Sequence, residues 1–137
     1  MSPDARLFCG LTLILVPTII YGGLTVLGVV SGGRYGAPAP PDLTPMQVTF
    51  YRAGHAHAGV LMLLALFVQI ALDHVSLQLP LLVRPLRVAA IAGPLLVSAG
   101  FFGLAHFPPL RALLYLGAAI LAVTTVTVGV GLIRTRA

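Results

Sequence analysis

The sequence predicts an all-α integral membrane protein that folds as a four-helix transmembrane bundle. Of its 137 residues, 58% are hydrophobic and only 8% are charged, whereas a soluble domain has about 25% charged residues. The apolar residues also gather in four runs, each long enough to cross roughly 30 Å of hydrocarbon as a helix. A water-soluble monomer and a disordered chain are both excluded, because the chain has too few polar residues to solvate its surface.

The four predicted helices make up one transmembrane domain over residues 1–137. They cover about residues 7–30, 46–72, 86–107 and 110–133. Runs of this kind are helical in lipid, because every backbone N–H and C=O must be satisfied within the segment. The first run is longer than the apolar core of a signal peptide, so we expect it to remain as an uncleaved helix. Only Pro108 and Pro109 separate the last two runs, which predicts a tight antiparallel hairpin.

Arginine supplies all eight basic residues, which lie singly or in pairs near the ends of the apolar runs. This pattern is typical of headgroup anchors and topology signals, so the expected partner is the lipid bilayer and not nucleic acid. With the N-terminus inside, the inner arginines are Arg6, Arg84, Arg87, Arg134 and Arg136, and the outer ones are Arg34, Arg52 and Arg111. The positive-inside rule then places both termini on the cytoplasmic side of the cell membrane.

The segment Arg52-Ala-Gly-His55-Ala-His57-Ala-Gly59 opens the second predicted helix. Imidazole side chains are uncommon in membrane-spanning helices and usually face a bundle interior or a cavity. Residues i and i+2 point about 200° apart on a helix, so His55 and His57 cannot share a face. Helical steps of three and four from His55 lead along a polar face. This face contains Tyr51, Arg52, Met62, Gln69 and Asp73. We therefore expect His55 in the bundle interior, and His57 toward another neighbour, a partner protein or lipid.

A third histidine, His106, ends the third predicted helix on the same side of the membrane. One chemistry that suits this arrangement is a b-type haem with His55 and His106 as axial ligands, His57 as the substitute and Arg52 at a propionate. The other is a copper site made of the same imidazoles with Met62 or Met46. Zinc or di-iron hydrolysis is not supported, because the chain has no Glu and no Asp within a predicted helix middle.

Two further hypotheses need no cofactor. Small residues in transmembrane helices usually mediate helix packing, and they recur here in Gly22-Gly23, Ala89-xxx-Gly93 and Ala99-xxx-Gly103. A chain built only for packing would be an accessory or scaffold subunit that binds another membrane protein or a second copy of itself. Alternatively, a lipid-accessible cavity with His55, Tyr51 and Gln69 as polar groups would suit a small enzyme or transporter for an apolar substrate.

The Arg52–Gly59 segment, followed by a leucine-rich helix, resembles the His-x-His helix of small membrane proteins related to haem–copper oxidase subunit I. This resemblance implies that His55 or His57 is a haem-iron ligand. The oxidases' three-histidine copper site and Trp-bearing segments are missing, and the chain has no Trp, so the resemblance implies haem binding without oxygen reduction. The whole chain is also similar to small four-helix membrane proteins that carry the same segment. The leading sequence-based hypothesis is a small b-type haem protein for electron transfer or sensing, with its site near the extracytoplasmic face.

Overall fold

The computed structural model describes residues 1–35, 37–38, 42–75 and 80–135, and α-helices make up most of them. The four long helices are α1 (Pro3–Ser31), α2 (Pro45–Ala71), α3 (Val83–Leu104) and α4 (Arg111–Arg134). Two single-turn 3₁₀ helices, η1 (Pro80–Leu82) and η2 (Pro108–Leu110), lead into α3 and α4. No strand occurs in these residues, which confirms the all-α prediction with four helices.

Local capping residues determine where α1 and α2 begin. The hydroxyl of Ser2 accepts a hydrogen bond from the amide of Ala5, and Pro3 occupies the first turn. α1 therefore starts several residues before the first long apolar run, because this cap satisfies one of the otherwise free amides of the first turn. Thr44 and Gln47 form a capping box at the start of α2, since each side chain bonds the other's backbone amide.

α3 and α4 form the predicted antiparallel hairpin, with their backbones in contact at glycines. A Cβ atom built on Gly117 would lie 2.7 Å from the amide nitrogen of Val97 and 2.8 Å from the carbonyl oxygen of Gly93. One built on Gly100 would lie 2.6 Å from the amide nitrogen of Leu114. Small residues thus let these two helices approach more closely than side chains would allow, as in other apolar helix pairs.

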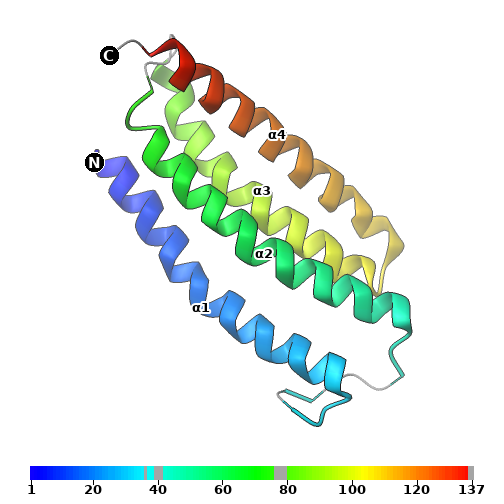
Figure 1. Cartoon of the computed structure of the whole chain (residues 1–137). Coiled ribbons are helices and arrows are strands. Elements are labelled where there is room, and N and C mark those ends of the chain that lie inside the picture. Colours follow the sequence, from blue (N-terminus) through cyan, green and yellow to red (C-terminus); the bar gives the residue numbers. More distant parts are fainter. Residues whose placement is uncertain (36, 39–41, 76–79, 136–137) are drawn as a thin grey trace.

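The four helices lie side by side in the order of the sequence, as an open row (Figure 1). α3 packs against both α2 and α4, and α1 packs mainly against α2. Over the described residues, α1 and α4 do not touch. The start of α1 and the end of α4 lie at the same end of the molecule, the end with the termini, and the η2 turn lies at the opposite end (Figure 1).

Most apolar side chains lie on the outside of this row. Ile14 and Phe67 are 71% and 70% exposed, whereas a small buried cluster joins Val68, Ala90 and Val128 from three helices. All four helices are long and apolar enough to cross a membrane. A face of this kind would be costly in water, and it matches the surface that lipid or another apolar protein would cover. The predicted inner arginine Arg136 lies outside the described residues.

Candidate functional site

His55 lies in the first half of α2, and its ring packs on the glycine pair of α1. A Cβ atom built on Gly23 would lie 3.1 Å from both Cε1 and Nε2 of His55, and one built on Gly22 would lie 3.8 Å from Nδ1. Gly23 therefore provides space that the ring occupies, whereas the contact at Gly22 is an ordinary van der Waals distance. No described residue forms a hydrogen bond with this imidazole, so its nitrogens are available to a ligand.

Two cavities meet at His55. The first encloses about 250 Å³ among α1, α2 and α3, and the second encloses about 410 Å³ between α1 and α2. Ile19, His55 and Met62 line both of them. The remaining walls are mostly aliphatic, with Phe102 in the first cavity. Together they give His55 an apolar environment with room for a small molecule on two sides.

Ser98 contributes a second uncommitted polar group to the first cavity. Its residue is 9% exposed, and no described residue hydrogen-bonds its buried Oγ. A serine within a helix usually bonds the carbonyl four residues earlier, here that of Pro94, but Ser98 does not. A buried hydroxyl without a partner costs about 1–3 kcal/mol. A ligand that satisfied this hydroxyl would recover part of that free energy.

Tyr51 and His106 form a pair at the end of the molecule that contains the η2 turn. The Tyr51 hydroxyl oxygen lies 2.8 Å from Nε2 of His106, and the two rings meet edge to face at 5.8 Å. The side-chain amide of Gln47 donates to the carbonyl of Ala105 at 2.8 Å. These contacts hold the residue after α3 against the start of α2. His106, the predicted second ligand, is therefore already engaged by Tyr51.

His57 points away from the cavities, as its spacing from His55 requires. Its Nδ1 lies 2.7 Å from the carbonyl oxygen of Ala53, and its ring packs on Phe101 at a centroid distance of 4.8 Å. Because a carbonyl only accepts, Nδ1 carries a proton and donates this hydrogen bond. Arg52 is exposed, and no described residue pairs with it.

The three histidines predicted as ligands thus have three different surroundings. His55 lies against α1, His57 against Phe101, and His106 against Tyr51. Among the residues that the structure describes, no three His, Cys, Asp or Glu side chains gather where they could hold a metal ion. Of the three, His55 is the one whose nitrogens are both free and beside a cavity.

A buried polar network that was not predicted from the sequence joins α2 and α3 to the residue before α1, at the end with the termini. Arg87, expected to anchor a headgroup, is only 1% exposed. Its guanidinium donates to a carboxylate oxygen of Asp73 at 2.6 Å and to the carbonyl of Gln69 at 2.8 Å. The side-chain amide of Gln69 in turn donates to the carbonyl of Arg87 at 2.8 Å. Gln69 is therefore committed to this network and does not line either cavity at His55.

Asp73 accepts hydrogen bonds from Ser2, the N-cap of α1, as well as from Arg87 of α3. The hydroxyl and the amide of Ser2 donate to its two oxygens, each at 2.7 Å. The Ser2 hydroxyl bond, supported by the Ser2 amide and by Arg87, lowers the pKa of Asp73 from its ordinary value of 3.8. The sequence contains a signal for this network, because Asp73 and Arg87 lie on either side of the connection between α2 and α3. How deeply the contact between these two side chains is buried depends on how the helices pack, which the sequence pattern does not reveal.

The Tyr51–His106 contact gives a testable effect on stability. Tyr51→Phe removes the hydroxyl and keeps the ring, so we expect a loss of about 1 kcal/mol, the usual contribution of one hydrogen bond. Denaturant unfolding of the detergent-solubilised protein measures this loss. Tyr115→Phe is the matched control, since Tyr115 is 68% exposed and no described residue bonds its hydroxyl. Equal effects of the two substitutions would contradict a structural role for the pair.

The site of greatest chemical interest is therefore the pair of cavities around His55, with Ser98 as its second polar group. The network of Asp73, Arg87 and Gln69 lies at the other end of α2 and is engaged internally. Comparisons of this chain with protein-family models, with curated proteins and with solved structures find no match.

Proposed function

We propose that the protein is a multi-pass protein of the cell membrane with both termini in the cytoplasm. The exposed apolar faces of the row support this location, because lipid is the solvent that such faces require. The end with the termini carries four of the described arginines, and the opposite end carries three: Arg6, Arg84, Arg87 and Arg134 against Arg34, Arg52 and Arg111. The positive-inside rule favours the cytoplasm for the end with the larger number. The cavities at His55 then lie within the membrane, with the Tyr51–His106 pair toward the outer side.

We further propose that the protein binds a small lipid-soluble molecule at His55, as a carrier or sensor of that molecule. The observation that carries this proposal is the free imidazole of His55, which faces two apolar cavities. The imidazole and the Ser98 hydroxyl can each donate one hydrogen bond into the first cavity. A compact apolar molecule with a carbonyl or ether oxygen has the complementary chemistry. The cavities, of about 250 and 410 Å³, suit a small ring system or a short chain.

Binding is favoured over catalysis by the surroundings of His55. A histidine that acts as a general base is usually oriented by a hydrogen bond to a carboxylate or a carbonyl. Among the described residues, none supplies such a bond to His55. The acid at the far end of α2, Asp73, is held by Arg87 and Ser2.

A b-type haem is the second candidate, and the same free imidazole favours it. His55 could supply one axial ligand, and the resemblance of its segment to the His-x-His helix supports this role. His106 would have to leave Tyr51 before it could supply the second ligand. Copper bound by His55 and the nearby thioether of Met62 is the corresponding metal-ion alternative.

Photolabelling tests the proposed binding site. Benzophenone is a suitable probe, because it is apolar, carries one carbonyl oxygen and couples to nearby C–H groups on illumination. With the protein in lipid nanodiscs, we expect labelled peptides from α1, α2 and α3 around His55. His55→Ala should reduce this labelling about tenfold, since a hydrogen bond to a buried partner is worth about 1–1.5 kcal/mol.

His57→Ala is the matched control, because it removes the same side chain two residues away on the outward face. Its labelling should equal that of the original protein. Equal labelling of the His55 and His57 variants would refute binding at His55. An absorption spectrum of the same samples separates the candidates, since a Soret band that His55→Ala abolishes would establish haem in place of the small-molecule ligand. If no labelling occurred and a partner protein copurified with this chain in a fixed ratio, the result would instead favour an accessory subunit.

A further inference from the structure

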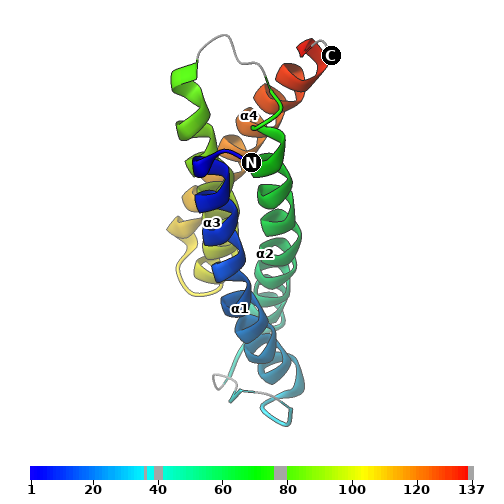
Figure 2. The same cartoon turned by 90° about the vertical axis from the view of Figure 1, so that its left-hand side faces the viewer.

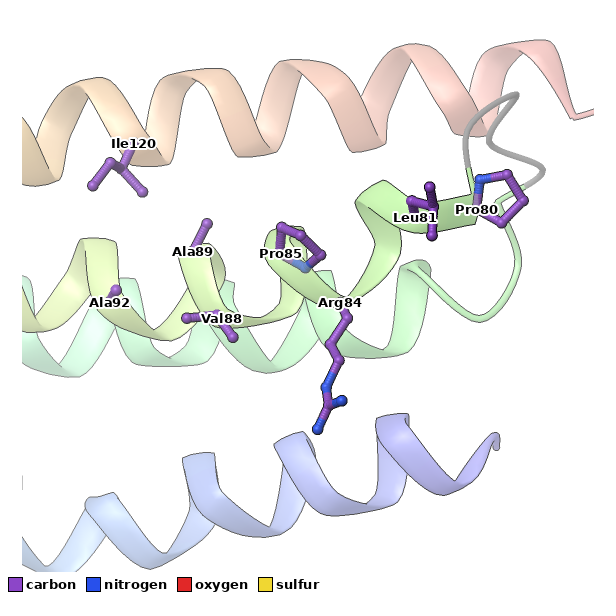
Figure 3. A pocket seen from close by; sticks show the side chains of 8 residues that line it. All are labelled: Pro80, Leu81, Arg84, Pro85, Val88, Ala89, Ala92 and Ile120. Atoms are coloured by element: carbon purple, nitrogen blue, oxygen red, sulfur yellow. The ribbon is translucent and has the colours of Figure 1, made fainter.

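A shallow apolar groove lies over the first half of α3, at the end of the molecule that carries the termini (Figure 3). It encloses about 770 Å³, and Ile120 of α4 forms its far wall. An adjoining hollow of about 340 Å³ shares Pro85, Ala89 and Ile120 with it. Apart from Arg84, the side chains that line the groove are aliphatic or proline (Figure 3). The two hollows therefore form one continuous apolar surface.

The groove exists because α4 leans away from this part of α3. Near its end, α4 packs toward α2, where Val128 joins the cluster with Val68 and Ala90. Figure 2 accordingly shows the beginning of α3 and the end of α4 well apart. Pro85 and Ala89 are too small to fill the space that this divergence leaves. The surface is thus a consequence of how the helices cross.

Arg84 supplies a positive charge at one edge of the groove. The side chain is exposed and extends away from α4 (Figure 3). Neither of the two acids at this end pairs with it: Asp73 is engaged by Arg87 and Ser2, and Asp4, in the first turn of α1, forms no ion pair with a described residue. An unpaired guanidinium beside an extended apolar surface complements an amphiphile that has an anionic head and an alkyl tail.

We propose that this groove is a binding site for an anionic phospholipid of the inner leaflet. The phosphate would pair with Arg84, whose planar guanidinium can hold two phosphate oxygens at once. One acyl chain would lie along α3 from Pro85 to Ala92, a length of about 11 Å of helix. This site is separate from the cavities at His55, and it depends only on the proposed membrane location and orientation.

The headgroup, and not the tail, should determine which lipid is bound. Lipid tails in the bilayer are as apolar as the groove, so burial of one acyl chain gives little preference for any lipid. The charge of Arg84 discriminates between headgroups, because an anionic phosphate group without a neighbouring ammonium attracts it most strongly. Selectivity should therefore fall when salt screens the charge.

Native mass spectrometry of the full chain, released from micelles with equal amounts of phosphatidylglycerol and phosphatidylcholine, tests this site. We expect the phosphatidylglycerol adduct to exceed the phosphatidylcholine adduct about fivefold, as one arginine near an anionic lipid predicts. Arg84→Gln should bring the two adducts to parity. Arg6→Gln is the matched control, because Arg6 is an exposed arginine at the same end but on α1.

Ala92→Trp tests the apolar part of the site, since a large ring there fills the groove. This variant should reduce both lipid adducts, and its thermal unfolding confirms that the fold is retained. A fivefold preference that survives in Arg84→Gln would overturn the proposal. So would an equal loss of preference in Arg84→Gln and Arg6→Gln, because it would indicate a general attraction of the basic end for anionic lipid.

Discussion

Asp73→Asn will lower the free energy of unfolding by about 3–5 kcal/mol, the usual cost of breaking a buried ion pair from one side. Arg87 has only 1% of its surface exposed and donates to Asp73 at 2.6 Å. An asparagine at position 73 leaves this guanidinium buried without its counter-charge. Thermal or denaturant unfolding in detergent micelles measures the effect. Asp42→Asn is the control, because Asp42 is exposed and has a positive φ of 59°, which asparagine also tolerates.

A substitution of the partner, Arg87, distinguishes the effect of the buried charge from the effect of side-chain packing. Arg87→Met removes the buried cation and keeps an unbranched side chain in its place, so the double variant Asp73→Asn/Arg87→Met should be more stable than Asp73→Asn alone. If the double variant lost the sum of the two single effects, the residues would not be coupled. The network would then contribute through separate contacts and not as an ion pair.

The acid sensitivity of the protein follows from the same group. The pKa of Asp73 is lowered in the folded state, so its contribution to stability is fully present above its ordinary value of 3.8 and is lost as the pH falls through the lower folded value. Unfolding measured from pH 5 downward should therefore show a loss of stability that begins near pH 4. Asp73→Asn should lack this part of the pH dependence.

Gly117→Leu will separate α3 from α4, with an expected loss of about 3 kcal/mol or more. A Cβ atom at this position would lie 2.7 Å from the amide nitrogen of Val97 and 2.8 Å from the carbonyl oxygen of Gly93. Both are backbone atoms, so no side chain can rotate away, and the helices themselves must move apart. Denaturant unfolding measures the loss of stability.

Gly129→Leu is the control on the same helix. No described atom lies within 4 Å of a Cβ built there, so the substitution should be neutral or should stabilise α4 by up to about 1 kcal/mol through helix propensity. A similar destabilisation by both leucines would mean that α4 does not depend on close contact at Gly117. The expected contrast therefore tests the hairpin packing directly.

The helices were predictable because lipid-length apolar runs allow few other structures. The start of α2 was also predictable, since Thr44 and Pro45 together signal a cap and a first turn. The start of α1 was not, because Ser2 and Pro3 place it ahead of the apolar run that defines the prediction. The hairpin contact at Gly93 follows the small-residue pattern of the sequence.

Of the site, only the relative directions of side chains along one helix could be predicted from the sequence. The two-residue spacing of His55 and His57 requires them to point apart, and in the structure they do. The partners of these side chains depend on how the helices are rotated and crossed, which periodicity does not determine. For the same reason the free hydroxyl of Ser98 and the burial of Arg87 could not be predicted from the sequence. The expectation that Gln69 lines a cavity with His55 was wrong, because its side-chain amide donates to the carbonyl of Arg87.

The open row of helices also determines how the molecule should respond to force. α1 packs mainly against α2, and it has no contact with α4 in the described part of the chain. A cantilever that pulls on the N-terminus therefore loads one helix boundary first, together with the hydrogen bonds between Ser2 and Asp73. We expect the first rupture to extract the 29 residues of α1 as a unit while the hairpin of α3 and α4 stays in place. The row would come apart from one edge, helix by helix.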